Sequence, residues 1–356
     1  MALDRNIAEL CDKAIASHVF PGCQVSYRRG GSSGSLVFGH LTYEPDAAPV
    51  VNETLYDVAS VTKSIPTSSI ILKLIEEGKL SLDDYAAKYL PELTGPGHEE
   101  ILVRHLLTFT VAFKLGASMA ELAQRDPAQL LTAIFQAPLE DRPGRRYVYT
   151  NTPSLLLGMI AERVSGRTLD VLAWERLFGP LGMSHTTFKP VMKIGPAEVN
   201  IAPTARDFRT EIRGIVHDPG ARAVFNNGQI PGHAGLFSTA DDLMKFANML
   251  LANGMFESRR FFTPETIEAM HTNQLGPVSQ DQTGLGWSIR NPNVMGKKVS
   301  EQAFGKTGFT GTMVLIDPAK DAAFVILSNR TYPETPESYE PMRAVWRDLA
   351  DLVFGD

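Results

Sequence analysis

Cysteine is almost absent from this sequence, which has only Cys11 and Cys23 among 356 residues. Two cysteines supply neither a disulfide framework nor the ligand pattern of a zinc site, so we expect two buried thiols. No apolar run reaches the length of a membrane span. Basic residues form no cluster, and 34 Lys and Arg against 40 Asp and Glu leave a net charge of −6. This balance argues against a nucleic-acid surface and favours a small neutral or cationic substrate.

An export signal is also missing from the start of the sequence. Residues 1–22 carry acidic side chains within their first turns and lack the long uncharged segment of a signal peptide. We therefore expect an amphipathic helix here and a cytoplasmic protein. The length, with 44% hydrophobic and 21% charged residues, favours one large mixed domain or two interleaved lobes.

Strand-like segments gather at the two ends of the chain, and helical periodicity fills the middle. The first hairpin is predicted from residues 22–29 and 35–41, joined by the turn GGSSG. The predicted later strands are 285–290, 312–317 and 322–329. From residue 61 the period becomes helical, with Ile70, Ile71, Leu74 and Ile75 in register and an end at Gly78. The further predicted helices are 101–107, 118–124, 127–136, 152–165, 168–177, 239–253 and 337–353.

This order predicts one sheet that is assembled from both ends of the chain. We expect an α/β lobe from residues 1–60 and 280–356 and a mainly helical lobe from residues 61–279. The active site would lie in the cleft where the two lobes meet.

The segment YDVASVTKSIP, residues 56–66, places Ser60 and Lys63 three residues apart at the predicted start of a helix. Positions i and i+3 share a helix face, so the lysine amine can approach the serine hydroxyl. Free N–H groups at a helix start also favour negative charge on an attacked oxygen. The pair can be a nucleophile and its base, or two surface side chains. Pro66 interrupts the helix, and we expect a short, tighter turn over residues 60–65.

A second motif, Tyr149-Thr150-Asn151, precedes the predicted helix 152–165. A phenol is a weak base at neutral pH, but nearby ammonium groups favour the phenolate. Asn151 can hydrogen-bond both a lysine and a substrate amide, and it can equally cap the helix.

A third motif, Lys306-Thr307-Gly308, lies at the edge of a predicted strand, where Gly308 permits close approach of a ligand to the backbone. The N–H groups of Phe309 and Ser60 together can form an oxyanion hole. The alternative is an edge strand that ends in a glycine turn.

With these three motifs in this order, the sequence resembles the serine β-lactamase and penicillin-binding-protein superfamily. The similarity is to its class C-like branch, which includes D-alanyl-D-alanine carboxypeptidases and family VIII carboxylesterases. It runs from about residue 18 to 330 and includes the segments LIEEGKLSLDDYAAKYLPEL, ILVRHLLTFT and GHAGLFSTADDLMKF. The resemblance implies a β-lactamase-like α/β plus all-α fold, with an antiparallel sheet flanked by helices and an inserted helical lobe.

The resemblance also implies the roles of the motif residues. Ser60 is the expected nucleophile of an acyl-enzyme, and Lys63 and Tyr149 share the general-base work. Asn151 orients Lys63 and the substrate. The ammonium group of Lys306 is a cation that can bind a substrate carboxylate. Which of Lys63 and Tyr149 is the base in each step is left open.

Other candidates are weaker. His233 can reach the cleft or serve as a structural loop histidine, and Trp287 can line the acyl pocket. His217 and Asp218 lack a further ligand at a fitting spacing, so we expect no metal and no cofactor.

The sequence thus predicts a serine hydrolase, first a carboxylesterase on small esters. The alternative with the same catalytic residues is a β-lactamase or a D-alanyl-D-alanine carboxypeptidase or amidase. A third possibility is a binding protein that kept the fold and lost turnover. We expect a small-molecule ester or amide as the partner, and neither nucleic acid nor membrane.

Overall fold

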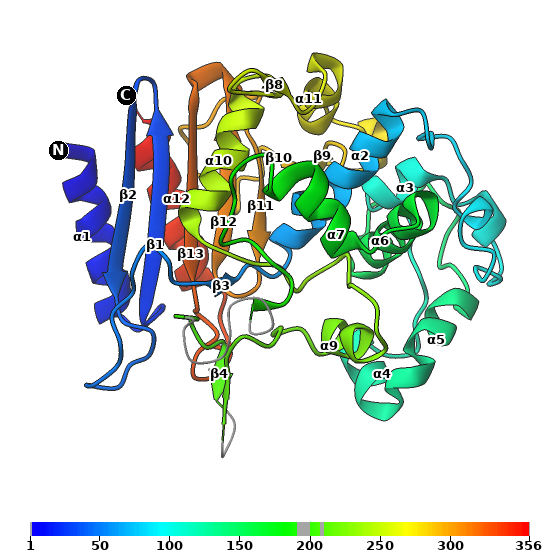
Figure 1. Ribbon diagram of the computed structural model, residues 1–356, viewed down its shortest axis with the longest axis horizontal. Helices are drawn as coiled ribbons and strands as arrows, with labels where there is room; N and C mark the ends of the chain where they lie inside the picture. The colour runs from blue at the N-terminus through cyan, green and yellow to red at the C-terminus, as the bar shows by residue number, and fades with distance from the viewer. Residues whose placement is uncertain (1, 191–199, 207–209, 356) are drawn as a thin grey trace.

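The computed structural model describes residues 2–190, 200–206 and 210–355. Its centre is a seven-stranded antiparallel sheet with the strand order β2-β1-β13-β12-β11-β10-β9 (Figure 1). These strands are β1 (Gly22–Arg29), β2 (Ser32–Gly39), β9 (Gln282–Thr283), β10 (Ser288–Ile289), β11 (Phe304–Gly308), β12 (Thr312–Asp317) and β13 (Ala322–Ser328). Because β1 pairs with β13, the two ends of the chain meet in the middle of the sheet.

Helices surround this sheet and fill the region beside it. The α-helices are α1 (Ala2–Ala16), α2 (Ser69–Glu76), α3 (Val103–Leu107), α4 (Met119–Arg125), α5 (Leu130–Gln136), α6 (Thr152–Ser165), α7 (Leu169–Ala173), α9 (Pro219–Asn226), α10 (Ala240–Leu251), α11 (Pro264–His271) and α12 (Glu340–Phe354). Single turns and π-helical segments are η1 (Lys63–Ser68), η2 (Ala86–Lys88), η3 (His98–Glu100), η4 (Pro127–Gln129), η5 (Trp174–Phe178), η6 (Gly276–Val278) and η7 (Pro318–Lys320). Two-residue strands pair outside the main sheet as β3 (Tyr56–Asp57) with β6 (Phe237–Ser238), β4 (Ala205–Arg206) with β5 (Glu211–Ile212), and β7 (Met255–Phe256) with β8 (Arg259–Arg260).

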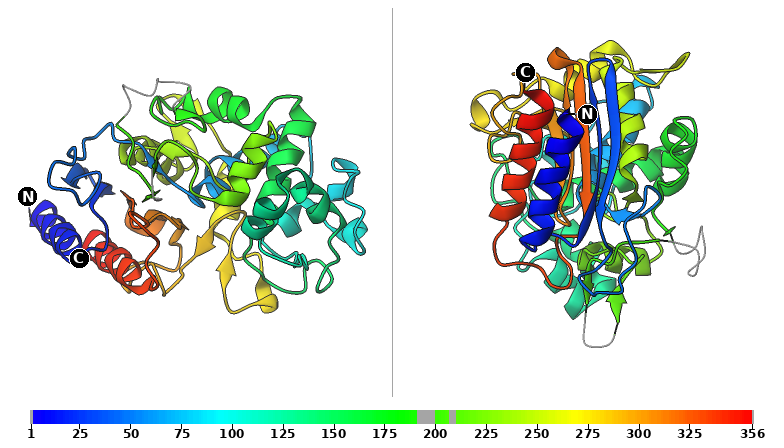
Figure 2. Two further views of the ribbon diagram at one scale, coloured as in Figure 1. Left: turned by 90° about the horizontal axis from the view of Figure 1, so that it is seen from below. Right: turned by 90° about the vertical axis from the view of Figure 1, so that its left-hand side faces the viewer.

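Both faces of the sheet are covered. Helices α1 and α12 lie side by side on one face, and α10 packs on the other (Figure 2). In β13, Phe324 and Ile326 join the core under α1 and α12, whereas Val325 and Leu327 join the core on the α10 side. A strand that is buried on both faces needs apolar residues at every position, which explains why this segment reads as a continuous apolar run.

The helical region lies beyond α10 and is built around α6. Residues 152–161 of α6 are all buried, so this helix is central rather than amphipathic. It contacts η1, α2, α3 and α7, and η1 follows directly on the turn that holds Ser60. The fold therefore brings the start of η1, the start of α6 and the end of β11 to one place.

The predicted fold class is confirmed, but several predicted bounds are wrong. Strand β2 begins at Ser32, because the chain already turns at Gly30, where φ is 56°. The strand predicted over 285–290 is paired only at Ser288–Ile289. The division by residue range into two lobes stays a prediction, and α10, from within 61–279, packs on the sheet. Among the described residues, no helix is long and apolar enough to cross a membrane.

Candidate active site

Ser60 and Lys63 are in direct contact. The Nζ atom of Lys63 lies 2.8 Å from Oγ of Ser60 and donates a second hydrogen bond, of 2.9 Å, to the main-chain oxygen of His233. Lys63 is buried, with 1% of its surface exposed. An amine at this distance can accept the serine proton once the amine is neutral.

The turn that carries Ser60 is held by its neighbours. The carboxylate of Asp57 accepts from the N–H of Ala59 at 2.8 Å, where φ is 46°, and from the N–H of His217 at 2.7 Å. Two hydroxyls reach across to the same segment: Thr310, in the turn after β11, donates to the Asp57 carbonyl, and Thr312, at the start of β12, donates to the Val58 carbonyl. The position of Ser60 is therefore fixed against the sheet rather than by its own helix alone.

The tighter turn that we expected over residues 60–65 is present only in its first part, where the N–H groups of Val61, Thr62 and Lys63 donate to the carbonyls three residues earlier in the chain. Residues 63–68 form the π-helical segment η1, in which Ile65 leaves helical geometry with φ −117° and ψ 107°. A proline has no N–H to donate and its ring excludes the regular α-helical path, so the helix widens around Pro66. The Ser68 hydroxyl and the Ser69 hydroxyl close the widened turn by donating to the carbonyls of Lys63 and Ser64.

Burial changes the charge state of both lysines at the site. It lowers the pKa of Lys63, and the nearby Lys306 ammonium lowers it further, while Tyr149 and Asp218 act in the opposite direction. Burial alone lowers the pKa of Lys306 to about 7. Both side chains therefore titrate closer to neutral pH than an exposed lysine does, which suits proton transfer.

Tyr149 lies between the two amines and is open to solvent. Its ring centroid is 4.2 Å from Nζ of Lys306 and 5.5 Å from Nζ of Lys63. The ring also packs on that of Phe109, with the ring centroids 5.0 Å apart. The side chain is 44% exposed, so its phenol can meet a substrate.

Asn151 makes a different contact from the one that we expected. Its side-chain amide donates to Oδ2 of Asp218 at 3.3 Å, and among the described residues no hydrogen bond joins Asn151 to Lys63. Asn151 and Ser60 nevertheless line the same cavity. The amide can therefore meet a substrate, while its orientation is set by Asp218.

The motif Lys306-Thr307-Gly308 forms the end of β11, close to the Ser60 turn. A Cβ at Gly308 would collide with Oγ1 of Thr312 and the main-chain oxygen of Val58, so only glycine permits this approach. Within the described part of the chain, no acceptor takes the N–H of Ser60 or that of Phe309. Two free N–H groups beside the serine are the arrangement that an oxyanion hole needs.

A cavity of about 240 Å³ opens at Ser60. Its lining is mostly apolar and comes from Asp57, Ala59, Ser60, Asn151, His217, Asp218, Pro219, Ala234 and Phe309. The ring of His217 stacks on that of Phe309, with centroids 5.7 Å apart. The space suits a small acyl group.

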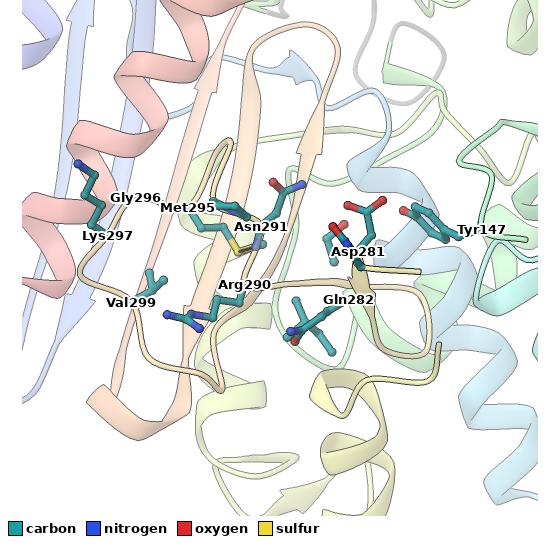
Figure 3. A pocket seen from close by; sticks show the side chains of 13 residues that line it. Tyr147, Asp281, Gln282, Arg290, Asn291, Met295, Gly296, Lys297 and Val299 are labelled. Carbon is teal, nitrogen blue, oxygen red and sulfur yellow. Dashed lines mark hydrogen bonds between the residues drawn. The ribbon is translucent and has the colours of Figure 1, made fainter. Parts of the chain in front are cut away.

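A second, polar cavity of about 460 Å³ lies beside β10 (Figure 3). Tyr147 and Asp281 form one end of it, and Lys297 lies at the other end. Ser288, Asn291 and Met295 also line a smaller cavity, of about 160 Å³, that reaches Lys306 and Thr307. The polar space beside β10 therefore extends to the segment of β11 that carries Lys306.

Two predicted pocket residues do not line the cavity at Ser60. The side chain of His233 is buried, with Nε2 3.4 Å from Oδ1 of Asp218. Trp287 is also fully buried and packs edge-on against Phe304 in the core. Among the described residues, no cluster of three or more potential ligands could hold a metal ion.

Sequence reasoning missed the site role of Asp218, which we had weighed only as a metal ligand. The available signal was the run Asp218-Pro219, an N-cap residue followed by proline at the first helical position, which predicts the start of α9. This pattern could predict where α9 starts, but it could not show that the capping residue, Asp218, lines the same cavity as Ser60.

Comparison with known proteins agrees with this geometry. The family model described as Beta-lactamase matches residues 3–345. A protein of Escherichia coli K12 that carries the provisional name D-alanyl-D-alanine carboxypeptidase is 32% identical over 342 residues, which cover 88% of this chain and 77% of that protein.

Solved structures share the fold at lower sequence identity. EstCE1, described as a hydrolase with promiscuous acyltransferase activity, superposes with a TM-score of 0.77 at 22% identity, covering 99% of this chain and 98% of that one. A class C beta-lactamase solved with cefoxitin gives a TM-score of 0.76 at 21% identity, with 98% of each chain covered.

Proposed function

The chain belongs to the beta-lactamase family, and from that premise we propose that it is a serine hydrolase that forms an acyl-enzyme at Ser60. One observation carries the proposal: the buried amine of Lys63 lies 2.8 Å from the Ser60 hydroxyl, at a cavity that can hold an acyl group. A hydrolase of this kind acts on small esters or amides.

In the first half-reaction, neutral Lys63 takes the proton of the Ser60 hydroxyl as Oγ attacks the carbonyl carbon. The N–H groups of Ser60 and Phe309 stabilise the negative oxygen of the tetrahedral intermediate. The intermediate collapses, and the leaving group takes a proton from Lys63, directly or through Tyr149. Water then attacks the acyl-enzyme with one of the same two groups as its base, which releases the acid and restores Ser60.

We propose small carboxylic esters as the preferred substrates. The cavity at Ser60 is small and mostly apolar, which fits a short acyl chain. The similarity of fold to EstCE1 is consistent with ester hydrolysis but, at 22% identity, supports only the fold. A cytoplasmic location stays a prediction, which cell fractionation would test.

A second candidate is D-alanyl-D-alanine carboxypeptidase activity, in keeping with the provisional name of the Escherichia coli relative. Two features of this chain favour it. The buried Lys306 can pair with a terminal carboxylate, and the polar cavities beside β10 offer room for a peptide.

A substrate panel separates the two candidates. Purified wild type and Ser60→Ala are assayed on short-chain p-nitrophenyl esters, on a D-alanyl-D-alanine peptide and on nitrocefin. We expect ester hydrolysis to be fastest and to fall by at least about 10³-fold in Ser60→Ala, because the nucleophile is lost. Faster release of D-alanine than of p-nitrophenol would favour the second candidate. Ester hydrolysis that survives in Ser60→Ala would refute the proposed nucleophile.

A further inference from the structure

Asp218 receives hydrogen bonds from three separate segments. Its Oδ2 accepts from the side-chain amide of Asn151 at 3.3 Å, at the start of α6. Its Oδ1 accepts from the N–H of Ala221 at 2.7 Å, within the first turn of α9, and lies 3.4 Å from Nε2 of His233. One carboxylate thus joins two helix starts and a loop.

Two of these contacts continue toward the reacting atoms. The main-chain oxygen of His233 accepts the 2.9 Å hydrogen bond from Nζ of Lys63. The preceding carbonyl, of Gly232, accepts from the Thr67 hydroxyl at 2.7 Å, so this loop is tied to η1 at two successive residues. Asn151 lines the cavity beside Ser60. A shift of Asp218 would therefore reach both the base and the substrate-facing amide.

We propose that Asp218 is a positioning residue for acylation: it fixes the amide of Asn151 and the His233 loop, and through the His233 carbonyl it holds Lys63 against Ser60. The inference rests on the proposed acyl-enzyme chemistry. Asp218 touches no reacting atom itself, and it acts through the groups that it orients.

The charge of Asp218 adds to this geometry. Burial raises its pKa, but the hydrogen bond from His233, the N–H of Ala221 and the charge of Lys63 outweigh burial and hold that pKa well below its usual range. Burial lowers the pKa of His233, so the imidazole is neutral at neutral pH. A buried carboxylate with a neutral histidine beside it leaves net negative charge facing Lys63.

Other titratable groups face the same region. Lys63 also meets Tyr149 and Lys306, which come from the α6 start and from β11. Asp218 also acts on His217, whose pKa burial lowers to about 4, and on the carboxylate of Asp57, and the charge of Arg222 acts on both of these residues as well. None of these other groups is substituted in the Asp218 variant, so a change in the titration of Lys63 reports on Asp218.

The test variant is Asp218→Asn, which keeps a capping oxygen for Ala221 but removes the charge. An asparagine has one acceptor oxygen where three donors converge, so Asn151 or His233 loses its partner. The readout is the rate at which a fluorophosphonate probe labels Ser60, followed from about pH 5 to 9. We expect the plateau rate to fall roughly 10- to 100-fold through misplaced groups. The pH at which the labelling rate reaches half of its plateau should fall by about half a pH unit or more, because the negative charge that favours protonated Lys63 is gone.

The matched control is Asp126→Asn, which removes the same charge from the exposed cap of η4, where Asp126 accepts from the N–H of Ala128. It should label as the wild type does at every pH. If Asp218→Asn fails to fold by circular dichroism, Asp218→Ser, another capping residue, takes its place with the same expected result.

The outcomes separate this inference from the proposed function. The role of Asp218 alone is overturned if the wild type labels at Ser60 while Asp218→Asn labels within about twofold of the wild-type rate and with the same pH midpoint. Wild type that fails to label overturns the acyl-enzyme proposal and this inference with it. A lower plateau together with an acid-shifted midpoint supports both.

Discussion

At the scale of single residues, the two buried lysines differ in what surrounds them. Lys63 donates to two oxygens, those of Ser60 and His233. Lys306 instead lies over two aromatic rings, 4.2 Å from the centroid of Tyr149 and 4.9 Å from that of Phe109. Among the described residues no carboxylate pairs with it. Lys306 is therefore a cation that can bind a substrate anion.

This difference predicts a pH-dependent preference for anionic substrates. Burial lowers the pKa of Lys306 to about 7, so its positive charge is present below pH 7 and is lost as the pH rises above it. A depsipeptide with a free terminal carboxylate should show a KM that rises roughly tenfold or more between about pH 6 and 8.5, because a charge-assisted contact is lost. The measurement is the ratio of that KM to the KM of the matching carboxamide, which cancels the titration of Lys63.

Lys306→Met supplies the control, since methionine fills similar space without charge. In this variant the KM ratio should be flat across the same pH range. A ratio that is flat in the wild type as well would show that Lys306 does not meet the substrate carboxylate.

The residues that the sequence could identify are those within short motifs. The spacing of Ser60 and Lys63 predicted a contact, and the structure places Nζ of Lys63 2.8 Å from Oγ of Ser60. The partner of Asn151 could not be found in this way. Asp218 is 67 positions further along the chain, and no local spacing encodes a contact that arises from the packing of α9 against the rest of the site.

At the scale of elements, α6 and the loop around Gly232 pack without room for a side chain. A Cβ at Gly232 would collide with the main-chain oxygen of Ser154 and come within 3.0 Å of Cα of Gly158. The same loop presents the His233 carbonyl to Lys63. The close approach of helix and loop is therefore part of what positions the amine.

We expect Gly232→Ala to separate the loop from α6 and to displace the His233 carbonyl. Overpacking of this kind costs about 1–3 kcal/mol of unfolding free energy, and a shift of the base costs roughly 10-fold or more in kcat. Thermal melts followed by circular dichroism measure the first effect, and ester hydrolysis measures the second.

Gly116→Ala is the matched control, because nothing lies within 4 Å of the added methyl group there. This variant should keep the kcat of the wild type, and its melting temperature should lie within a few degrees of the wild-type value. A Gly232→Ala enzyme with wild-type kcat would show that the position of this loop does not matter to the reaction.

Element prediction succeeded where apolar residues and breakers agree. The bounds of α6 and β12 match the predicted 152–165 and 312–317, since glycine and charged residues close both segments. Helices α9 and α11 were not predicted, because each is only eight residues long and too short to show a clear period. The π-helical geometry of η1 depends on how its widened turn is closed by Ser68 and Ser69, which proline alone does not specify.

At the scale of the whole molecule, the position of apolar runs at both ends of the chain was enough to predict one sheet from two distant segments. The pairing of β1 with β13 confirms it. The relative placement of the three motifs was predicted from family resemblance. Periodicity alone could not supply it, because the contact of η1 with α6 joins residues that are at least 84 positions apart (152 − 68).

The central claim is that a substrate acylates Ser60, and a trapped adduct tests it most directly. The protein is mixed with a short-chain p-nitrophenyl ester or with penicillin, quenched in acid within the first turnovers, and mapped by peptide mass spectrometry. We predict an acyl mass added to the peptide that contains Ser60 in wild type, and none in Ser60→Ala. Substrate turnover with no adduct on that peptide, or an adduct that persists in Ser60→Ala, would contradict the account, and absence of both turnover and adduct would identify the chain as a binding protein of this fold.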